Sequence, residues 1–546
     1  MTPLSARGVF RTALVLTIAC AGAALPLHAD EAGADAAALF AAGRFDEARD
    51  AAKATLAKDA TNADAARLLQ DALLVMGDAK GAAAVAPAGA PEVVLKGLAA
   101  RVDEPKKAAK ALTAIVKTDG APPRFRLDLA RAHLAAGTAS AAEAAVTVFL
   151  KATPDDAEAM TLLADVLVVR NKKTTARKTY TAVLEATPGH AGAAIGLATV
   201  LAGMKRGDES REILKAALAV HPRHPHLLIA MADDQVRTGE YDAALRTLGT
   251  VLDLPVPKAD VHAHLAEVHR AKADYKSAET CAKAATAIEQ NHARAIRVMG
   301  FVKFKRGDLE GALGDYGAVA LLRPDYAQIH ADIALVQLTG DKLKEAEAAA
   351  KQALKIDKNL LDGHLRMGQV LYLRGKGKQA KKSFDAVLKQ QKDHVLVNRY
   401  MGYVLLDEGK PKSAIKHFQV VADALEKDSS SVRMVGRCQL EMGKVEDAVN
   451  SFREAVSRNE KDGWAFFDLG KGLEKQEKWD DAAAAYEQAI AVDPKLPHPR
   501  LYLAELLDEV QGEPEQALPH YKAYLELGGH DEGKAIAKRI EQLEKP

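Results

Sequence analysis

The sequence has an internal repeat with a period of 34 residues. A small residue returns at that spacing from residue 108 to residue 482, at Ala108, Ala142, Ala176, Ser210, Ala244, Ala278, Ala312, Ala346, Ala380, Ala414, Ala448 and Ala482. The series extends outward with Ala48 and Ala82 on one side and Ala517 on the other. A repeat of this length indicates stacked structural units rather than one central core.

Other landmarks keep register with the small residue. A Gly lies five places before it, an aromatic residue four places after it and a Pro twelve places after it, as at Gly137, Tyr316 and Pro154. The Gly permits a turn between two helices, the small residue lets their backbones approach, and the aromatic ring fills the space between them. The Pro ends the second helix, because its ring clashes with the preceding turn. Each repeat is therefore predicted to be an antiparallel helix pair.

A single pair cannot be stable alone. Ordering about 34 backbone residues costs on the order of 30–60 kcal/mol, which the buried face of one helix pair does not offset. Stacked neighbours bury both faces, so stability becomes a sum of repeat and interface contributions. The repeats are therefore expected to form one continuous stack.

This pattern resembles the tetratricopeptide repeat family. The family's pairing of a large apolar residue with a small one in the first helix is found at Met299-Gly300, Met367-Gly368, Met401-Gly402, Val435-Gly436 and Leu469-Gly470. The resemblance covers residues 30 to 527. It implies an all-α solenoid of about 14–15 helix pairs, wound as a right-handed superhelix with the first helices lining a concave groove.

The repeat register divides the chain. The first repeats occupy residues 30–86, and the interval between Ala82 and Ala108 shrinks to 26 residues. A Pro/Gly-rich break at residues 87–91 explains the shorter interval and is a possible hinge. The main solenoid then runs over residues 92–527. Residues 528–546 are expected to form a capping helix, because one of its faces is apolar and the other charged.

The first 29 residues have the features of a secretory signal peptide. Two Arg residues precede an apolar run that is too short for a comfortable membrane span, and small residues end with Ala29. Cys20 leaves lipidation open, although Thr17 stands where a bacterial lipobox has Leu. A retained anchor is another alternative. We expect an exported protein, periplasmic or associated with the outer membrane.

The resemblance also places candidate partner-binding residues. In the family the groove is lined by the second, fifth, ninth, twelfth and thirteenth positions of each first helix. In this sequence those positions include Arg294, Arg297, Phe301, Phe304, Tyr372, Arg399, Tyr403, Arg433, Arg437, Trp464, Phe467 and Lys471. Arg interleaved with aromatic residues is typical of binding hot spots. An idle, solvated stripe is the alternative interpretation.

Several kinds of site are not expected. The family's carboxylate clamp needs groove Asn residues that this sequence lacks. The histidines of HPRHPH (221–226) and VHAH (261–264) have no acid or Cys to complete a metal site, and Cys281 and Cys438 are too far apart to form a disulfide. Lys plus Arg total 75 and Asp plus Glu 74, so no net charge attracts nucleic acid. We expect no cofactor, no metal and no enzymatic activity.

These features predict a non-catalytic scaffold of the bacterial cell envelope. Its partners are expected to be proteins or extended peptides of a secretion or assembly system, bound in the groove. The alternative is an accessory protein of polysaccharide export that handles a polymer.

Overall fold

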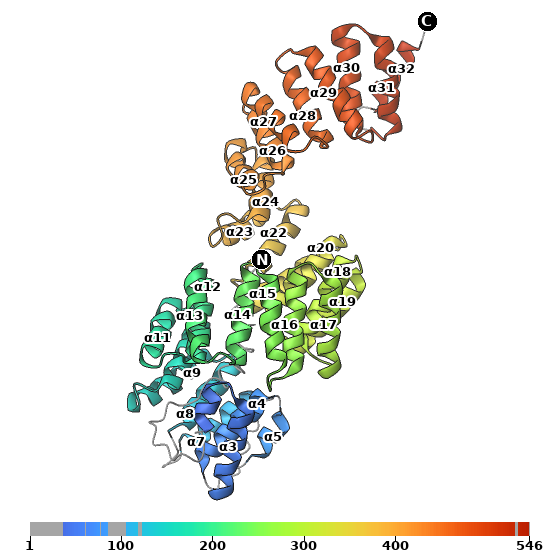
Figure 1. The fold of residues 1–546 in the computed structure, drawn as a ribbon. Helices are drawn as coiled ribbons and strands as arrows, with labels where there is room; N and C mark the ends of the chain where they lie inside the picture. Colours follow the sequence, from blue (N-terminus) through green and yellow to red (C-terminus); the bar gives the residue numbers. More distant parts are fainter. Residues whose placement is uncertain are drawn as a thin grey trace. The chain divides into compact units, whose positions relative to one another are not determined.

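The computed structural model describes residues 36–60, 62–76, 78–85, 105–117, 123–529 and 533–544. The predicted signal peptide, Cys20 and the break at residues 87–91 lie outside the described residues. The described secondary structure is helical throughout, with no strand in these ranges. The chain is therefore an all-helical solenoid of paired helices, as the sequence predicts (Figure 1).

The chain folds into two compact units, and the boundary between them lies within helix α20, between Ile329 and His330. The helices up to this point are α2 (Ala36–Ala41), α3 (Phe45–Lys58), α4 (Ala63–Val75), α5 (Ala79–Ala84), α7 (Pro105–Ile115), α8 (Phe125–Ala135), α9 (Ala139–Ala152), α10 (Ala157–Val169), α11 (Lys173–Ala186), α12 (Ala191–Gly203), α13 (Gly207–Val220), α14 (Pro225–Arg237), α15 (Tyr241–Leu252), α16 (Lys258–Ala271), α17 (Tyr275–Ile288), α18 (Ala293–Lys305), α19 (Leu309–Leu322) and α20 (Ala327–Thr339).

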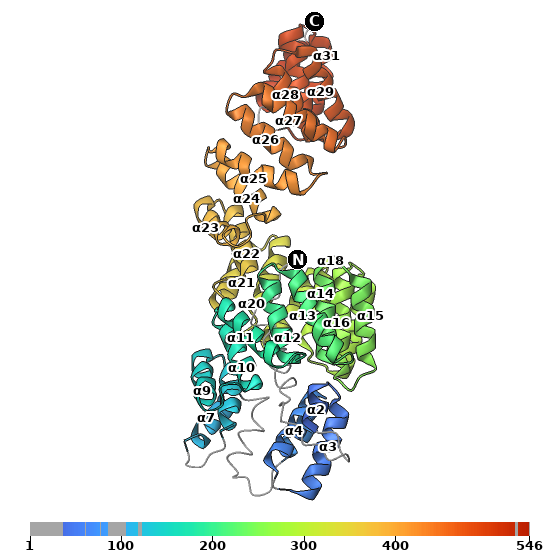
Figure 2. The same cartoon turned by 60° about the vertical axis from the view of Figure 1, so that its left-hand side comes forward.

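The second compact unit continues the same alternation of helices. It contains α21 (Leu343–Ile356), α22 (Leu361–Leu373), α23 (Gly377–Leu388), α24 (Val395–Asp407), α25 (Pro411–Ala424), α26 (Ser429–Glu441), α27 (Val445–Arg458), α28 (Gly463–Glu474), α29 (Trp479–Val492), α30 (Pro497–Glu505), the π-helical turn η1 (Leu506–Gln511), α31 (Pro514–Glu526) and α32 (Gly533–Leu543). Consecutive helices pack side by side in both compact units (Figure 2). The handedness of the superhelix stays a prediction.

The landmark small residues all lie inside the helix pairs. Ala142, Ala278 and Ala414 are 0 % exposed, and Ser210, the one polar member, is 2 % exposed and donates a hydrogen bond to the carbonyl of Ala198. A larger side chain would separate the paired helices at each of these points. The expectation that these residues face inward is confirmed.

The turn between the two helices of a repeat has one conformation throughout. Its Gly residues have positive φ, for example 84° at Gly307. Five repeats carry another residue at this register position, and those residues are the positive-φ non-Gly residues of the described chain: Asn171, Lys205, Ala273, Asp341 and Glu477. The stack therefore imposes the turn even where the side chain disfavours it.

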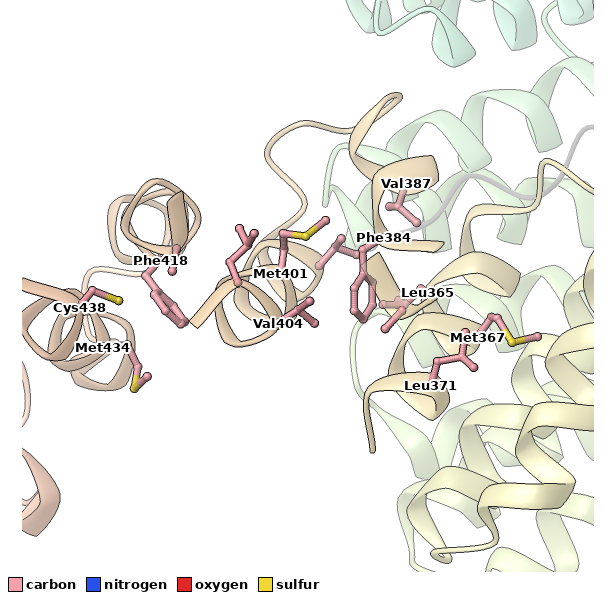
Figure 3. Packing of buried hydrophobic residues seen from close by; sticks show 14 of the residues in the cluster. Leu365, Met367, Leu371, Phe384, Val387, Met401, Val404, Phe418, Met434 and Cys438 are labelled. Atoms are coloured by element: carbon pink, nitrogen blue, oxygen red, sulfur yellow. The ribbon is translucent and has the colours of Figure 1, made fainter. Parts of the chain in front are cut away.

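The large–small pair of the first helix has a steric function. A Cβ added at Gly402 would lie 2.6 Å from the ring of Phe418, and one at Gly436 would lie 2.5 Å from the ring of Phe452. Each Gly thus makes room for the aromatic residue of its own repeat. In the second compact unit the ring of Phe418 joins a continuous apolar cluster with Met401, Val404 and Cys438 (Figure 3).

The last repeat contains one extra residue. Ala517 follows Ala482 by 35 residues instead of 34. The π-helical turn at Leu506–Gln511 absorbs this residue, because a π turn adds one residue to an α-helix. After it, α32 packs Ile536, 6 % exposed, against the cluster that includes Tyr521 and Tyr524 and so covers the end of the stack.

Candidate partner-binding surface

Charged residues of α16 and α18 are paired across the first helices of adjacent repeats. Arg297 Nη1 lies 3.5 Å from Glu267 Oε1, and the guanidinium of Arg297 lies over the ring of Tyr326 at 5.9 Å. Arg294 Nη1 lies 2.8 Å from His264 Nδ1. Burial would raise the pKa of Glu267, but the guanidinium groups of Arg270 and Arg297 outweigh burial and lower it. Glu267 is therefore ionised and holds these arginines in place.

The two predicted phenylalanines of α18 lie among cations. Arg270 Cζ is 5.0 Å from the ring centroid of Phe301, and Lys305 Nζ is 5.5 Å from the same ring. Lys305 Nζ also lies 6.0 Å from the ring of Phe304. Both rings are half-buried. This stretch therefore presents cations and aromatic rings together, a composition that suits acidic and aromatic ligand groups.

The predicted arginines of the second compact unit differ in availability. Arg399 Nη2 is 3.0 Å from Asp428 Oδ2, and Arg433 Nη1 is 2.9 Å from Asp468 Oδ2. Arg437 is exposed, and the described residues hold no ion pair to it. Two of the three guanidinium groups are thus neutralised by the next repeat, and only Arg437 offers an unpaired charge.

A group of three tyrosines joins α22 and α24. The ring of Tyr372 lies edge-on to Tyr400 at 5.6 Å and is stacked on Tyr403 at 6.4 Å. Tyr403 also contacts the buried ring of Phe418 at 5.2 Å. Burial and the neighbouring carboxylate of Asp407 raise the pKa of Tyr372 to about 12. These half-buried rings are fixed by packing and present a preorganised aromatic surface.

A second aromatic group lies on α28 and α30. Trp464 is 38 % exposed and its ring lies 5.6 Å from that of His498. Lys471 Nζ lies 5.1 Å from the ring of Tyr502. Phe467, predicted to line the groove, is only 5 % exposed and packs edge-on against Tyr502 at 5.1 Å. Its ring belongs to the core because the aromatic residues around it leave it little contact with solvent.

The acidic and aromatic residues that contact these predicted groove residues were not themselves predicted from the sequence. Asp428 and Asp468 lie 29 and 35 residues after their arginine partners. An Arg followed by an acid at about one repeat length is a usable signal, because such residues lie in neighbouring repeats. Tyr400 and Tyr502 lack such a signal, since only packing decides which half-buried rings meet.

Sites of other kinds are not found in the described part of the chain. No group of three or more His, Cys, Asp or Glu residues there is arranged to hold a metal ion. His224, His292 and His394 instead cap helices by accepting hydrogen bonds from backbone N–H groups. Cys281 and Cys438 are free thiols, and burial raises the pKa of Cys438 to about 12. Within the described ranges, none of the helices has the length and apolar character needed to cross a membrane.

Comparison with known families agrees with the repeat geometry. A family model described as tetratricopeptide repeat matches residues 98–157, 229–292, 300–359, 365–429 and 467–532, which is more than half of the chain. A second model of the same description matches residues 174–233. The chain belongs to the tetratricopeptide repeat family. It is a repeat scaffold for protein–protein interaction, and proteins of this family are typically non-catalytic.

Several solved structures have similar arrangements at low sequence identity. Cut9–Hcn1, an APC/C hetero-tetramer, is 14% identical over 83% of this chain and 96% of that chain, with a TM-score of 0.46. PilF of Pseudomonas aeruginosa is 17% identical over 40% and 97%, with a TM-score of 0.35, and YrrB, a tetratricopeptide protein with an unusual peptide-binding site, is 21% identical over 33% and 92%, with a TM-score of 0.30. No curated protein matches the sequence. Likeness at this level identifies no partner.

Proposed function

We propose that this tetratricopeptide protein is an exported scaffold of the bacterial cell envelope. It binds extended segments of proteins that belong to a secretion or assembly system, along the groove lined by its first helices. Three features support the proposal: the family's role in protein interaction, the signal-like pattern of residues 1–29, and the row of Arg and aromatic residues at groove positions. The chemistry of the groove then indicates which partner groups fit.

The unpaired charge of Arg437 is the observation that carries this proposal. Asp428 and Asp468 hold Arg399 and Arg433, so these two are fixed parts of the groove wall. A carboxylate of a partner can pair with Arg437 without breaking an internal ion pair. The tyrosine group around Tyr403 provides aromatic surface for an apolar neighbour of that carboxylate. The fitting partner segment therefore carries an acidic residue and an apolar or aromatic one.

A single charge reversal tests this assignment. Arg437→Glu is expected to weaken capture of envelope proteins by the exported protein at least about tenfold, which corresponds to about 1.4 kcal/mol. The matched control is Arg453→Glu, which reverses an exposed charge on the second helix of the same repeat. Reversal of Arg399 or Arg433 is unsuitable, because the new carboxylate would face Asp428 or Asp468. Equal capture by both variants would refute the role of Arg437.

Export is tested separately. Fractionation of bacteria that express the full chain is expected to place the protein outside the cytoplasm, and sequencing of its new N-terminus is expected to find cleavage after Ala29. Cys20→Ser distinguishes a lipid tether, since it would release a lipidated protein from the membrane fraction and leave a soluble one unchanged. Retention of the uncleaved chain in the cytoplasm would contradict the proposal.

Polysaccharide handling is the second candidate. The exposed indole of Trp464, beside His498 and Phe467, offers the flat aromatic surface on which a sugar ring stacks. Oligosaccharides of an exported polymer should then quench tryptophan fluorescence of the parent protein but not of Trp464→Phe. The unchanged Trp479 serves as an internal reference. Identical spectra across a panel of glycans would remove this candidate.

A further inference from the structure

The helices α2–α5 form a small module within the first compact unit. Residues of α2, α3 and α4 pack into a cluster of their own that contains Phe40, Phe45 and Val75. The module (residues 36–85) therefore has a core of its own.

The module contacts the main solenoid through the groove positions of its own α4. Counted from Ala82, Arg67 and Asp71 occupy the fifth and ninth positions of the first helix. Arg67 Nη2 lies 3.0 Å from Glu158 Oε1 on α10 and 3.6 Å from Asp128 Oδ1 on α8. Glu158 is itself at the second position of its repeat. A groove position of α4 thus contacts both α8 and α10.

This contact excludes water from several charges. Asp71, Asp128 and Glu158 are each at most 6 % exposed, and Arg131, which pairs with Asp128 and Glu158, is 2 % exposed. Burial would raise the pKa of Glu158, but Arg131 and Arg67 outweigh burial and lower it. Ionised groups that are this well buried need partners. The contact between α4 and the groove is therefore specific rather than a loose collision of surfaces.

A second contact lies further along the solenoid, at the start of α14. The ring of Phe45 lies 5.9 Å from that of His224 and 5.8 Å from that of His226. The turn residue Gly43 lies so close that an added Cβ would be 2.9 Å from the Cα of His224. His226 is at the second position of its repeat, as Glu158 is. The module thus covers groove positions in two separate repeats.

If the module withdraws, the positive and negative side chains that stay in the groove still pair with one another. Arg67 and Asp71 would leave together, and they carry opposite charges. Asp128 and Glu158 would keep Arg131, and Glu158 would keep Arg124, whose Nη1 is 3.5 Å from Glu158 Oε2. Asp128 and Glu158 thus both keep a cationic partner, so departure avoids the large cost of leaving either carboxylate uncompensated. The charged residues therefore allow the contact between the module and the groove both to form and to be broken.

We infer that residues 36–85 are an internal ligand of the groove between α8 and α14, and that a partner must displace them to bind there. The displacing segment places a guanidinium group between Asp128 and Glu158, where Arg67 lies in the resting chain. This inference rests on the proposed function only for the presence of a partner. Occupation of the groove by the module is a property of the chain itself.

Distance measurement on the full chain tests the occupation. Spin labels are attached at Lys58→Cys and Lys151→Cys, both exposed, in a background of Cys20→Ser, Cys281→Ser and Cys438→Ala. The parent is expected to give one narrow distance distribution. Arg67→Glu is expected to broaden it and shift most of the population to other distances, because the new carboxylate faces Asp128 and Glu158. Arg49→Glu is the matched control, since Arg49 pairs only with its neighbour Asp50 among the described residues.

The outcomes separate cleanly. A narrow peak in the parent and in Arg49→Glu, lost in Arg67→Glu, supports the internal ligand. A broad parent distribution, or an unchanged peak in Arg67→Glu, overturns it. If circular dichroism shows that Arg67→Glu loses helix, Arg67→Gln replaces it, since it removes the charge without creating repulsion. The measurement uses no partner, so its failure is distinct from a failure to capture envelope proteins.

Discussion

At the scale of residues, the repeat depends on pairs of positions whose sizes must match. Gly300 and Tyr316 show the principle: a Cβ at position 300 would lie 2.7 Å from the ring of Tyr316 and 3.1 Å from the Cβ of Asp315. The aromatic ring fills the space that the missing side chain leaves. Glycine is retained there although it is a poor helix former, because packing between helices outweighs local propensity.

A matched pair of Gly→Ala variants tests this principle. Gly300→Ala is expected to destabilise the protein by about 1–3 kcal/mol, because the methyl group overpacks the helix pair. Gly314→Ala, in α19 with open space around it, should instead stabilise by up to about 1 kcal/mol through helix propensity. Urea unfolding followed by circular dichroism measures both. Equal effects of the two substitutions would show that propensity, not packing, governs position 300.

Buried histidines make the first compact unit sensitive to acid. Burial lowers the pKa of His226 from 6.5 to about 4; Asp260 opposes this shift and His264 adds to it. Below pH 6.5 the unfolded chain protonates this residue while the folded chain keeps it neutral. Stability is therefore complete above pH 6.5 and falls by up to about 3 kcal/mol as the pH approaches 4.

The prediction is checked by unfolding the protein at a series of pH values. His226→Gln cannot titrate, so its free energy of unfolding should fall less steeply between pH 6.5 and 4 than that of the parent. Part of the slope remains, because burial also lowers the pKa of His224. Parallel curves for parent and variant would mean that His226 is as easily protonated in the folded state as in the unfolded one.

At the scale of elements, the helix pair is set by the turn that closes it. The turn residue adopts positive φ in repeats with Gly and in repeats without it, such as Ala273 at 63°. Left-handed conformation costs an L-residue roughly 1–2 kcal/mol. These positions therefore hold strain that the stacked helices on either side compensate.

Replacing Ala by Gly and Gly by Ala at the turn position should change the stability of the protein in opposite directions. Ala273→Gly is expected to raise stability by about 1 kcal/mol, because it relieves the left-handed strain. Gly307→Ala, at φ 84°, should lower stability by a similar amount although nothing lies within 4 Å of the added Cβ. Thermal unfolding of both variants measures the sign. A stabilising Gly307→Ala would show that the turn relaxes away from positive φ.

At the scale of the whole molecule, the stack makes stability local. The described helices pack chiefly on their neighbours along the chain, and none of these helices spans a common core. A cavity in one repeat is therefore expected to loosen adjacent repeats and to leave distant ones unchanged. The contact between Arg67 and Glu158, 91 residues apart, is an exception within the first compact unit.

Hydrogen exchange measures how far a defect spreads. Phe452→Ala removes a ring that is 0 % exposed and should cost about 3–5 kcal/mol in its repeat. Amide protection is expected to fall in α26, α27 and α28 and to stay unchanged in α8–α10. The control Arg453→Ala, one residue further along α27, should change neither region. Uniform loss of protection along the chain would mean that the solenoid unfolds as a single cooperative body.

The sequence by itself determined the helix pairs, because their landmarks act over short distances. Alanine at a close approach, glycine at a left-handed turn and proline after a helix are each required by the sterics of their own repeat. Even the extra residue before Ala517 is visible as a 35-residue interval, although only packing located the π-helical turn that absorbs it at residues 506–511.

Only the tertiary structure decided which side chains meet between repeats. The sequence predicts that Arg399 and Arg433 are unpaired cations in the groove, yet each lies within 3.0 Å of a carboxylate in the following repeat. Phe467, which was also predicted to line the groove, lies in the core. The contact between Arg67 and Glu158 was likewise decided only by the tertiary structure. Such contacts depend on how far stacked repeats rotate and on which long side chains reach one another. A periodic sequence repeats the positions but does not encode these distances.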